Sequence, residues 1–280
     1  MAWTIFPAID IFAIETAHAT AGNRSTTRSR AVSGGWLAVC CVIAAGGHWM
    51  LASGFANGAP HPMIVLAMLA IAAGWWRTPP AAPTRADWWC FFIALLICLA
   101  PFRSAAVVSL ACAGAIFWPR GGVDARCSAA LMFALVGWGL KDGVWAGFAS
   151  APVLWIEAHV VAGLLGAGGV GAVAHGNHLE LADGHQFIVL RACSVLALAY
   201  PCAIGTFAFS RLLRPALSPG AARIGLALGL LALLNTARLT AMAASPAIYD
   251  SLHGESGALP LQLMWGVIVF AAAAIPSRST

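Results

Sequence analysis

The chain has 280 residues, of which 61% are hydrophobic and only 9% are charged. A water-soluble domain usually carries about 25% charged and about 45–50% apolar residues, so this composition excludes an ordinary soluble protein and indicates an integral membrane protein. The formal net charge of +5 comes almost wholly from arginines scattered between apolar runs, which argues against a nucleic-acid partner and suits a role in membrane topology.

Residues 1–35 are predicted to form a polar, basic tail on the cytoplasmic side, with a possible amphipathic piece around Ile5–Ile14. Residues 36–280 are predicted to form a single membrane domain. Its apolar runs are Trp36–Asn57, Pro62–Trp76, Asp87–Pro101, Ser104–Trp118, Cys127–Phe148, Pro152–Leu165, Cys193–Ser210, Ala222–Ala244 and Leu259–Ile275. Since a transmembrane helix needs about 17–25 apolar residues, these runs predict an all-α, polytopic membrane fold.

The positions of the arginines predict which runs cross the membrane. With the tail inside, Arg77 and Arg120 also fall inside, as the positive-inside rule requires. Arg211 would fall outside if every later run crossed. We expect Pro152–Leu165 not to cross, because it is short and contains Glu157, and we interpret it as an interfacial or re-entrant helix on the outer face. About eight transmembrane helices then remain, with both termini in the cytoplasm.

A β-hairpin is predicted between that outer-face helix and the next span. His178–Leu181 and Phe187–Leu190 flank an Ala-Asp-Gly-His turn, and the hairpin would rest outside the membrane, on the mouth of the bundle. Its possible metal ligands are His175, His178, Glu180, Asp183 and His185. We expect His175 and His178 on opposite faces of one extended strand, which favours a solvent-facing hairpin with no metal and no cofactor.

Three reactive side chains fall on the outer side by the same charge argument. Cys193 lies at the start of a span, whereas most of the other cysteines lie within apolar runs and behave as small hydrophobes. Arg238 lies near the outer end of its helix, one turn from Asn235 on the same face, where a charged group normally meets a partner or a wet cavity. His253 is expected in the loop before the last span, with Asp250 close enough in sequence to orient it.

The short motifs around these residues resemble a known family. RACSV at 191–195, NTAR at 235–238 and LHG at 252–254 are similar to the cysteine, arginine and histidine signature of the exosortase/archaeosortase family. The resemblance covers about residues 152–275, with Val195 standing where that family usually has glycine. It implies a catalytic core in which Cys193, Arg238 and His253 are catalytic, and we expect Asn235 and Asp250 to support them.

The resemblance implies a membrane-embedded cysteine transpeptidase or endopeptidase. Its substrates would be exported proteins with a carboxy-terminal motif, an apolar span and a basic tail. A guanidinium favours a thiolate and can hold an oxyanion, and a histidine can carry the proton, so the three groups suit a thioester acyl-enzyme. An unknown acceptor or water would release it. The enzyme would lie among the lipids of the cell's inner membrane, with its active site at the exoplasmic, periplasmic face.

One alternative stays open on the sequence alone. A non-enzymatic transporter could use Arg238 to bind an anionic solute, with Cys193 incidental. The two functions differ in one chemical respect, because a transporter should tolerate replacement of the thiol and a thiol enzyme cannot.

The charge pattern makes a topology prediction. Reporters fused after Arg214 should be cytoplasmic, and reporters inserted in the Ala174–His185 hairpin should be exoplasmic. Paired alkaline phosphatase and fluorescent protein fusions measure both positions. Finding both reporters on one side would remove the common face on which the predicted site depends.

Overall fold

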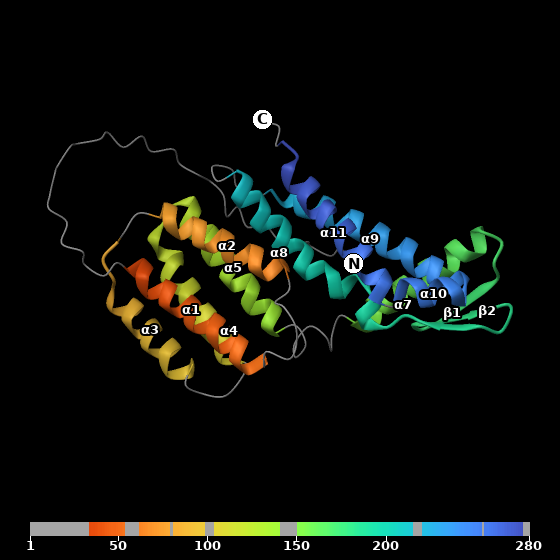
Figure 1. The fold of residues 1–280 in the computed structure, drawn as a ribbon, viewed down its shortest axis with the longest axis horizontal. Coiled ribbons are helices and arrows are strands. Elements are labelled where there is room, and N and C mark those ends of the chain that lie inside the picture. The colour runs from red at the N-terminus through yellow and green to blue at the C-terminus, as the bar shows by residue number, and fades with distance from the viewer. Residues whose placement is uncertain are drawn as a thin grey trace, which may run out of the picture. The chain divides into compact units, whose positions relative to one another are not determined.

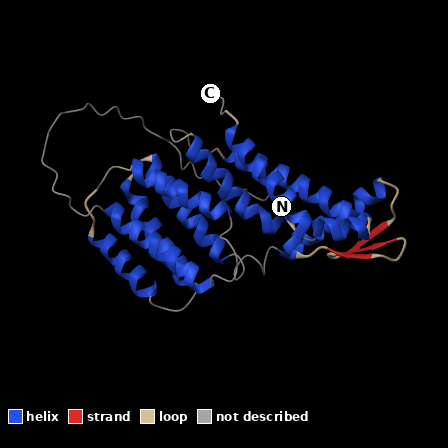
Figure 2. Cartoon of the chain, viewed as in Figure 1, coloured by secondary structure: helices blue, strands red, loops and turns tan. Residues whose placement is uncertain are grey.

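The computed structural model describes residues 34–53, 62–78, 81–98, 104–140, 150–214, 220–253 and 255–276. Over these residues the chain forms ten α-helices, two short 3₁₀ helices and one three-stranded antiparallel sheet (Figures 1 and 2). These elements belong to one compact unit, residues 32–280. The predicted tail, including Ile5–Ile14, lies outside the described residues apart from Gly34 and Gly35. The prediction of a mostly helical chain is confirmed.

The amino-terminal half forms helices at the predicted apolar runs. They are α1 (Gly34–Ser53), α2 (Pro62–Arg77), α3 (Arg85–Cys98), α4 (Ser104–Phe117) and α5 (Val123–Leu140), with a 3₁₀ turn at Trp118–Arg120. Helix α4 packs against α1, α3 and α5. Alanines such as Ala38, Ala106 and Ala113 are fully buried in this core. Such small side chains let helix backbones approach closely, which is how helices associate where lipid removes the hydrophobic drive.

The carboxy-terminal half carries the sheet and the longest helix. Its elements are α7 (Ser150–Ala167), β1 (Ala172–His175), β2 (His178–Leu181), β3 (Gln186–Ile188), a 3₁₀ turn (Arg191–Cys193), α8 (Val195–Leu213), α9 (Ala221–Ala244), α10 (Pro246–His253) and α11 (Glu255–Ala274). Helix α8 packs against α2 and α5 of the first half and against α9 and α11 of the second. At Gly205 of α8 a Cβ would collide with the sulfur of Met63 in α2, so a larger residue there would require the Met63 side chain to shift.

Helix length and composition mark the chain as a multi-pass membrane protein. Four of the described helices, α5, α7, α8 and α9, are long and apolar enough to cross a membrane, and shorter apolar helices lie within α1, α2, α4 and α11. Because α7 meets the same criteria as the others, they do not separate it from the crossing helices. Its predicted interfacial position therefore stays a prediction.

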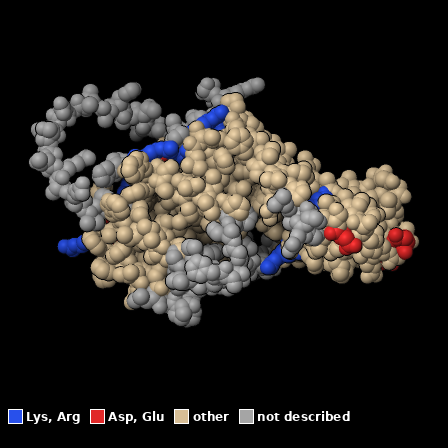
Figure 3. Space-filling model, in the orientation of Figure 1, with Lys and Arg blue, Asp and Glu red and all other residues tan. Residues whose placement is uncertain are grey.

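The surface agrees with a lipid environment. Most of the visible surface carries neither acidic nor basic side chains (Figure 3). Large apolar side chains are strongly exposed, including Leu96 and Leu233 at 70% each and Leu263 at 65%. A soluble monomer rarely exposes so much contiguous apolar surface, whereas a membrane protein presents it to hydrocarbon.

Ion pairs gather at one end of the helix bundle. Arg211 of α8 pairs with Asp124 of α5, and Arg77 of α2 lies 4.0 Å from the same carboxylate. Arg214 donates a 2.8 Å hydrogen bond to the carbonyl of Ala274, in the last turn of α11. These contacts bring the carboxyl ends of α2, α8 and α11 together with the amino end of α5, so basic side chains that are far apart in sequence share one end.

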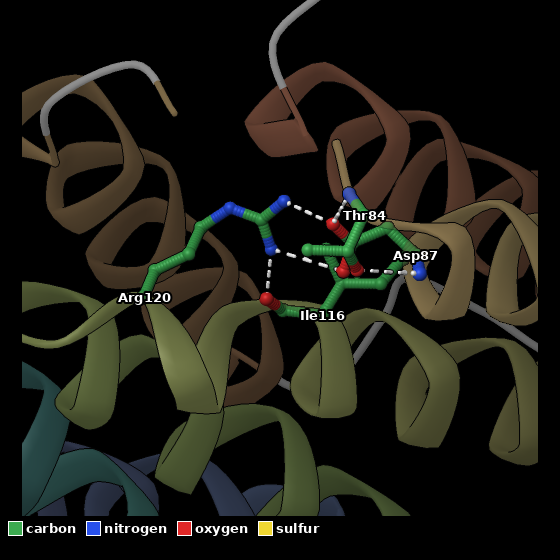
Figure 4. Close-up of polar contacts among 4 residues, drawn as sticks. All are labelled: Thr84, Asp87, Ile116 and Arg120. Carbon is green, nitrogen blue, oxygen red and sulfur yellow. Dashed lines mark hydrogen bonds and ion pairs between the residues drawn. The ribbon is translucent and has the colours of Figure 1, made fainter. Parts of the chain in front are cut away.

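A second ion pair joins Asp87, at the start of α3, to Arg120 (Figure 4), and both side chains are almost fully buried. Asp87 accepts a 2.8 Å bond from Arg120, and the two side chains are 5% and 7% exposed. Asp87 also accepts a 2.6 Å bond from the amide of Thr84, whose hydroxyl accepts from the amide of Asp87, so the two residues form a reciprocal cap on α3. Arg120 donates in addition to the carbonyl of Ile116. One carboxylate therefore fixes both the start of α3 and the end of α4.

Helix α9 extends beyond its neighbour α8. The amide of Asn235 donates to the carbonyl of Cys193, just before α8 begins, so residues 236–244 continue for about 14 Å past that level. Helix α7 and the sheet pack on this extension through a buried cluster that includes Val161 of α7, Leu179 of β2 and Met242 of α9. The extension of α9 is thus the surface on which α7 and the sheet pack.

The predicted hairpin exists as β2 and β3, but a third strand joins it. Strand β1 pairs with β2 in antiparallel register, with His175 opposite His178. Gly176, at φ 66°, and Asn177 form the two-residue turn between them. The expectation that His175 and His178 lie on opposite faces of one strand is therefore wrong, because cross-strand partners lie on the same face. A Gly-Asn pair is a known hairpin signal that the sequence interpretation passed over.

The Asp87–Arg120 pair generates a stability prediction. Asp87→Ala leaves a buried guanidinium without its partner and removes the cap on α3, so we expect the protein to lose about 3–5 kcal/mol. Thermal unfolding of the purified protein in detergent measures the effect, and Arg126→Ala, at an exposed position of α5, is the control. An unchanged unfolding midpoint for Asp87→Ala would show that this pair does not hold α3 to α4.

Candidate functional site

Cys193 lies where the sheet meets the bundle. It ends the 3₁₀ turn Arg191–Cys193, and the buried Ser194 caps α8 by accepting a 3.2 Å bond from the amide of Leu196. The Cys193 side chain is only 7% exposed and belongs to the cluster that joins α7, the sheet and the α9 extension. Serine at this position is a favoured helix cap, so the local sequence fixes the cysteine directly outside the first turn of α8.

His253 approaches this cysteine from 60 residues further along the chain. Its Nδ1 lies 3.8 Å from the Cys193 Sγ, within hydrogen-bonding distance for sulfur. His253 is the last residue of α10, so its predicted loop position is wrong. Pro246 begins this helix, and proline is favoured at a first helical position because its missing amide has no intrahelical partner there.

An aromatic stack orients the imidazole. Tyr249, one turn earlier on α10, lies against His253 with ring centroids 4.8 Å apart and planes 16° apart. Phe187 of β3 packs edge to face against Tyr249, with ring centroids 6.1 Å apart. The sheet therefore positions the histidine through Tyr249, and the imidazole reaches the thiol with its ring plane already set.

Arg238 ties α9 to the histidine's helix. Its guanidinium donates a 3.2 Å bond to the carbonyl of Leu252, the residue before His253. The Arg238 Nε is buried and has no hydrogen-bond partner. A cation beside the carboxyl end of a helix is favourable, and this bond also holds the end of α10 over the cysteine. The guanidinium thus uses one nitrogen to hold the Leu252 carbonyl, while its Nε–H group has no acceptor.

Asn235 and Glu157 hold the start of α8. The Asn235 amide donates to the Cys193 carbonyl at 3.0 Å and to Glu157 Oε1 at 3.3 Å, and the same carboxylate oxygen accepts a 2.7 Å bond from the amide of Val195. A carboxylate at a helix amino terminus is stabilised by the free amides there. Glu157 Oε2 and Asn235 Oδ1 are buried with no hydrogen-bond partner.

Burial raises the pKa of the Cys193 thiol, with Arg238 lowering it and Glu157 adding to the increase. The net direction is upward, so the thiol is protonated in the resting protein at neutral pH. Arg238 acts on the pKa in the direction that the sequence predicted, because it favours the thiolate, but desolvation outweighs it. A base must take the proton, and His253 is in contact with the sulfur.

A cavity of about 220 Å³ opens beside these groups. Its polar wall is formed by Asn235, Arg238, His253 and Gln262, and Ala192 brings the chain next to Cys193 into the lining. The rest of its wall is apolar and comes from α8, α9, α10 and α11: Leu198, Leu231, Leu234, Leu252, Leu261 and Trp265. The cavity is thus lined by both polar and apolar side chains, and it reaches the residue next to Cys193, although Cys193 itself does not line it.

The structure brings together four of the five residues that the sequence singled out. Cys193, Arg238, His253 and Asn235 converge, whereas Asp250 is exposed and makes no recorded bond to His253. The described site also includes Glu157, Tyr249 and Gln262, which the sequence interpretation missed as site residues. The signal for Glu157 was available, since an acid within an apolar run needs a partner.

The histidines of the sheet do not gather into a ligand set. Within the described ranges, no group of three or more His, Cys, Asp or Glu side chains has a geometry that could hold a metal ion. All eight cysteines are free thiols.

Comparison with known proteins gave no match to a family model, to a curated protein or to a solved structure.

The pKa argument yields a reactivity prediction. Arg238→Gln removes the charge that lowers the Cys193 pKa, so half-maximal alkylation of this thiol should move to higher pH. Glu157→Gln keeps an acceptor for the Val195 amide but removes the negative charge, so the midpoint should move to lower pH. Peptide-resolved mass spectrometry of iodoacetamide labelling against pH separates Cys193 from the other cysteines.

Arg126→Gln is the matched control, because it removes one positive charge from an exposed position of α5. Equal alkylation midpoints in all four proteins would mean that neither charge acts on the thiol.

Proposed function

We propose that the protein is an exosortase-like cysteine transpeptidase or endopeptidase, which cleaves carboxy-terminal sorting segments of exported proteins. The observation that carries the proposal is the 3.8 Å approach of His253 Nδ1 to Cys193 Sγ, with the Arg238 guanidinium bound to the carbonyl next to that histidine. The residues that match the family's signature thus lie near one another, and the three short motifs are the features by which this chain resembles that family.

The chemistry follows from these positions. His253 Nδ1 accepts the Sγ proton, and the sulfur attacks the substrate carbonyl carbon, so a C–S bond forms while the carbonyl oxygen becomes an oxyanion. The oxyanion accepts hydrogen bonds from the Arg238 N–H groups that Leu252 does not use. When the C–N bond breaks, the imidazolium returns the proton to the leaving amine and a thioester remains. An acceptor nucleophile or water then attacks the thioester and restores the thiol.

The proposed membrane topology uses the two ends of the bundle. The arginine-rich end faces the cytoplasm and the Cys193 end faces the exoplasmic side, with about eight crossing helices. Helix α7 and the sheet then lie on the outer surface, on the stretch of α9 that extends past the start of α8. Exposed Trp155 and Ile156, at 51% each, suit an α7 that rests in the interfacial lipid rather than in water.

The cavity suits a substrate that is polar at the cleaved bond and apolar beyond it. Such a substrate would place its scissile carbonyl near Arg238 and His253. Its following apolar span would lie against the apolar wall of the cavity, which includes Leu231 and Trp265. A basic tail after that span would stay on the cytoplasmic side. These features are the parts of a tripartite sorting segment, and the active site then works at the exoplasmic face of the inner membrane.

Processing of a tripartite substrate tests the proposal. Cys193→Ala should insert normally and stop processing, because the nucleophile is gone. Arg238→Lys keeps the charge but loses the planar set of donors, so processing should slow by about 10²–10³-fold. His253→Ala should be comparably severe. Asp250→Asn should stay near normal, since Asp250 is exposed and makes no recorded bond to the imidazole. A processing time course at matched membrane abundance measures all four.

Cys202→Ala, within α8, is the control for loss of a buried thiol and should process normally. Normal processing by Cys193→Ala would refute the thiol mechanism and favour the transporter alternative. Near-normal turnover by Arg238→Lys would restrict the arginine to holding Leu252 and α10.

A further inference from the structure

The first turn of α9 contains a buried arginine without a partner. Arg223 is 6% exposed, and both Nη1 and Nη2 are buried with no hydrogen-bond partner. A guanidinium stays charged at any physiological pH, and a buried charge is strongly unfavourable unless it is paired. The protein therefore holds a cation in a place that calls for an anion.

No described carboxylate is available to Arg223. Asp124 is used by Arg211 and lies near Arg77, and Asp87 is used by Arg120. Glu157, the one acidic residue within helices α7, α8 and α9, is bonded at the start of α8, at the opposite end of the bundle. An anion for Arg223 must then come from outside the described chain.

The backbone at this position also favours an anion. Gly220 caps α9 without a side chain, so it offers no side-chain acceptor to the amides of Ala221 and Ala222, whereas the Arg223 amide donates to the Gly220 carbonyl at 3.0 Å. Arg223 belongs to the same first turn as those amides. Free amides, the positive end of a 24-residue helix and a guanidinium together form a phosphate site.

An apolar cavity of about 320 Å³ begins at the next residue. Ile224 lines it, together with Ala134 of α5 and with Tyr200, Ala203 and Phe207 of α8. The Tyr200 hydroxyl donates to the Ala134 carbonyl at 3.0 Å, so its polar group is already satisfied. The first turn of α9 therefore provides a cation, and the residue after that cation lines an apolar space. A lipid, with an anionic head group and an acyl chain, has the complementary parts.

We propose that the amino terminus of α9 is an anionic-lipid site, in which Arg223 and the first-turn amides bind a lipid phosphate and the cavity beside Ile224 takes acyl chain. Basic pockets between transmembrane helices on the cytoplasmic side bind anionic head groups in this manner. The site lies near the opposite end of α9 from Arg238 and is independent of the thiol chemistry there. Its role is to hold the α8–α9 pair in the inner leaflet.

Lipid retention tests the proposal on the full chain. The protein is reconstituted into phosphatidylcholine nanodiscs with or without phosphatidylglycerol, and retained lipids are counted by native mass spectrometry after release. We expect the wild-type protein to retain phosphatidylglycerol in preference to phosphatidylcholine, and Arg223→Gln to bind it about ten-fold more weakly or worse. Arg126→Gln, which removes the same charge at an exposed site, should retain it normally. Ala203→Phe fills the cavity and should also weaken retention.

Inorganic phosphate added to phosphatidylcholine nanodiscs separates a lipid from a free ion. We expect phosphate alone not to raise the thermal unfolding midpoint, whereas phosphatidylglycerol raises it. Equal protection by phosphate would overturn the lipid assignment in favour of a free-anion site. Equal retention of both lipids by the wild-type protein, or equal losses in Arg223→Gln and Arg126→Gln, would overturn the site itself. The wild-type comparison still decides if Arg223→Gln does not fold.

Discussion

One buried polar contact joins the membrane bundle to the end that carries the sheet. Glu157 of α7 accepts hydrogen bonds from the backbone amide of Val195 and from the side-chain amide of Asn235. The Asn235 side chain also donates to the Cys193 carbonyl. The contact therefore fixes α7, α8 and α9 at one level. Removing one partner would leave a carboxylate or a helix start unsatisfied in a nearly dry place, which is why a polar group persists here in a chain with so few charges.

Helix α9 places buried polar side chains at two separate levels of the bundle. One stripe of α9, spaced every four residues, contains Arg223, Ala227, Leu231, Asn235 and Leu239, all buried. The alanine and leucines of this stripe seal the bundle, while Arg223 and Asn235 place polar groups at two separate levels. A helix of α8's length would end at Leu239 and would lack Met242 and Ala243, which are buried against α7 and the sheet. The extension of α9 is therefore what allows the sheet, α10 and the histidine to assemble outside the bundle.

The sequence predicts what depends on local composition and misses what depends on packing. Apolar runs and arginine spacing predict the helices, and Asp183-Gly184 predicts the β2–β3 turn. The convergence of Cys193, Arg238 and His253 followed from placing three span ends on one face. Strand β1 was missed because its four residues have no strong alternation. Helix α10 was missed because eight residues between two long helices resemble a loop, and without that helix Tyr249 cannot be placed on the His253 ring.

The raised pKa of the Cys193 thiol determines which roles His253 and Arg238 would have in the proposed reaction. In this buried site, desolvation destabilises the thiolate more than the charge of Arg238 stabilises it, so the sulfur keeps its proton in the resting protein. The base must then act when the substrate is bound, and His253 is the group in contact with Sγ. In the proposed mechanism, negative charge passes from sulfur to the carbonyl oxygen and so moves away from Glu157 and toward the guanidinium. Arg238 would then stabilise the transition state more than the resting protein, which is the condition for a group to accelerate a reaction rather than only to favour binding.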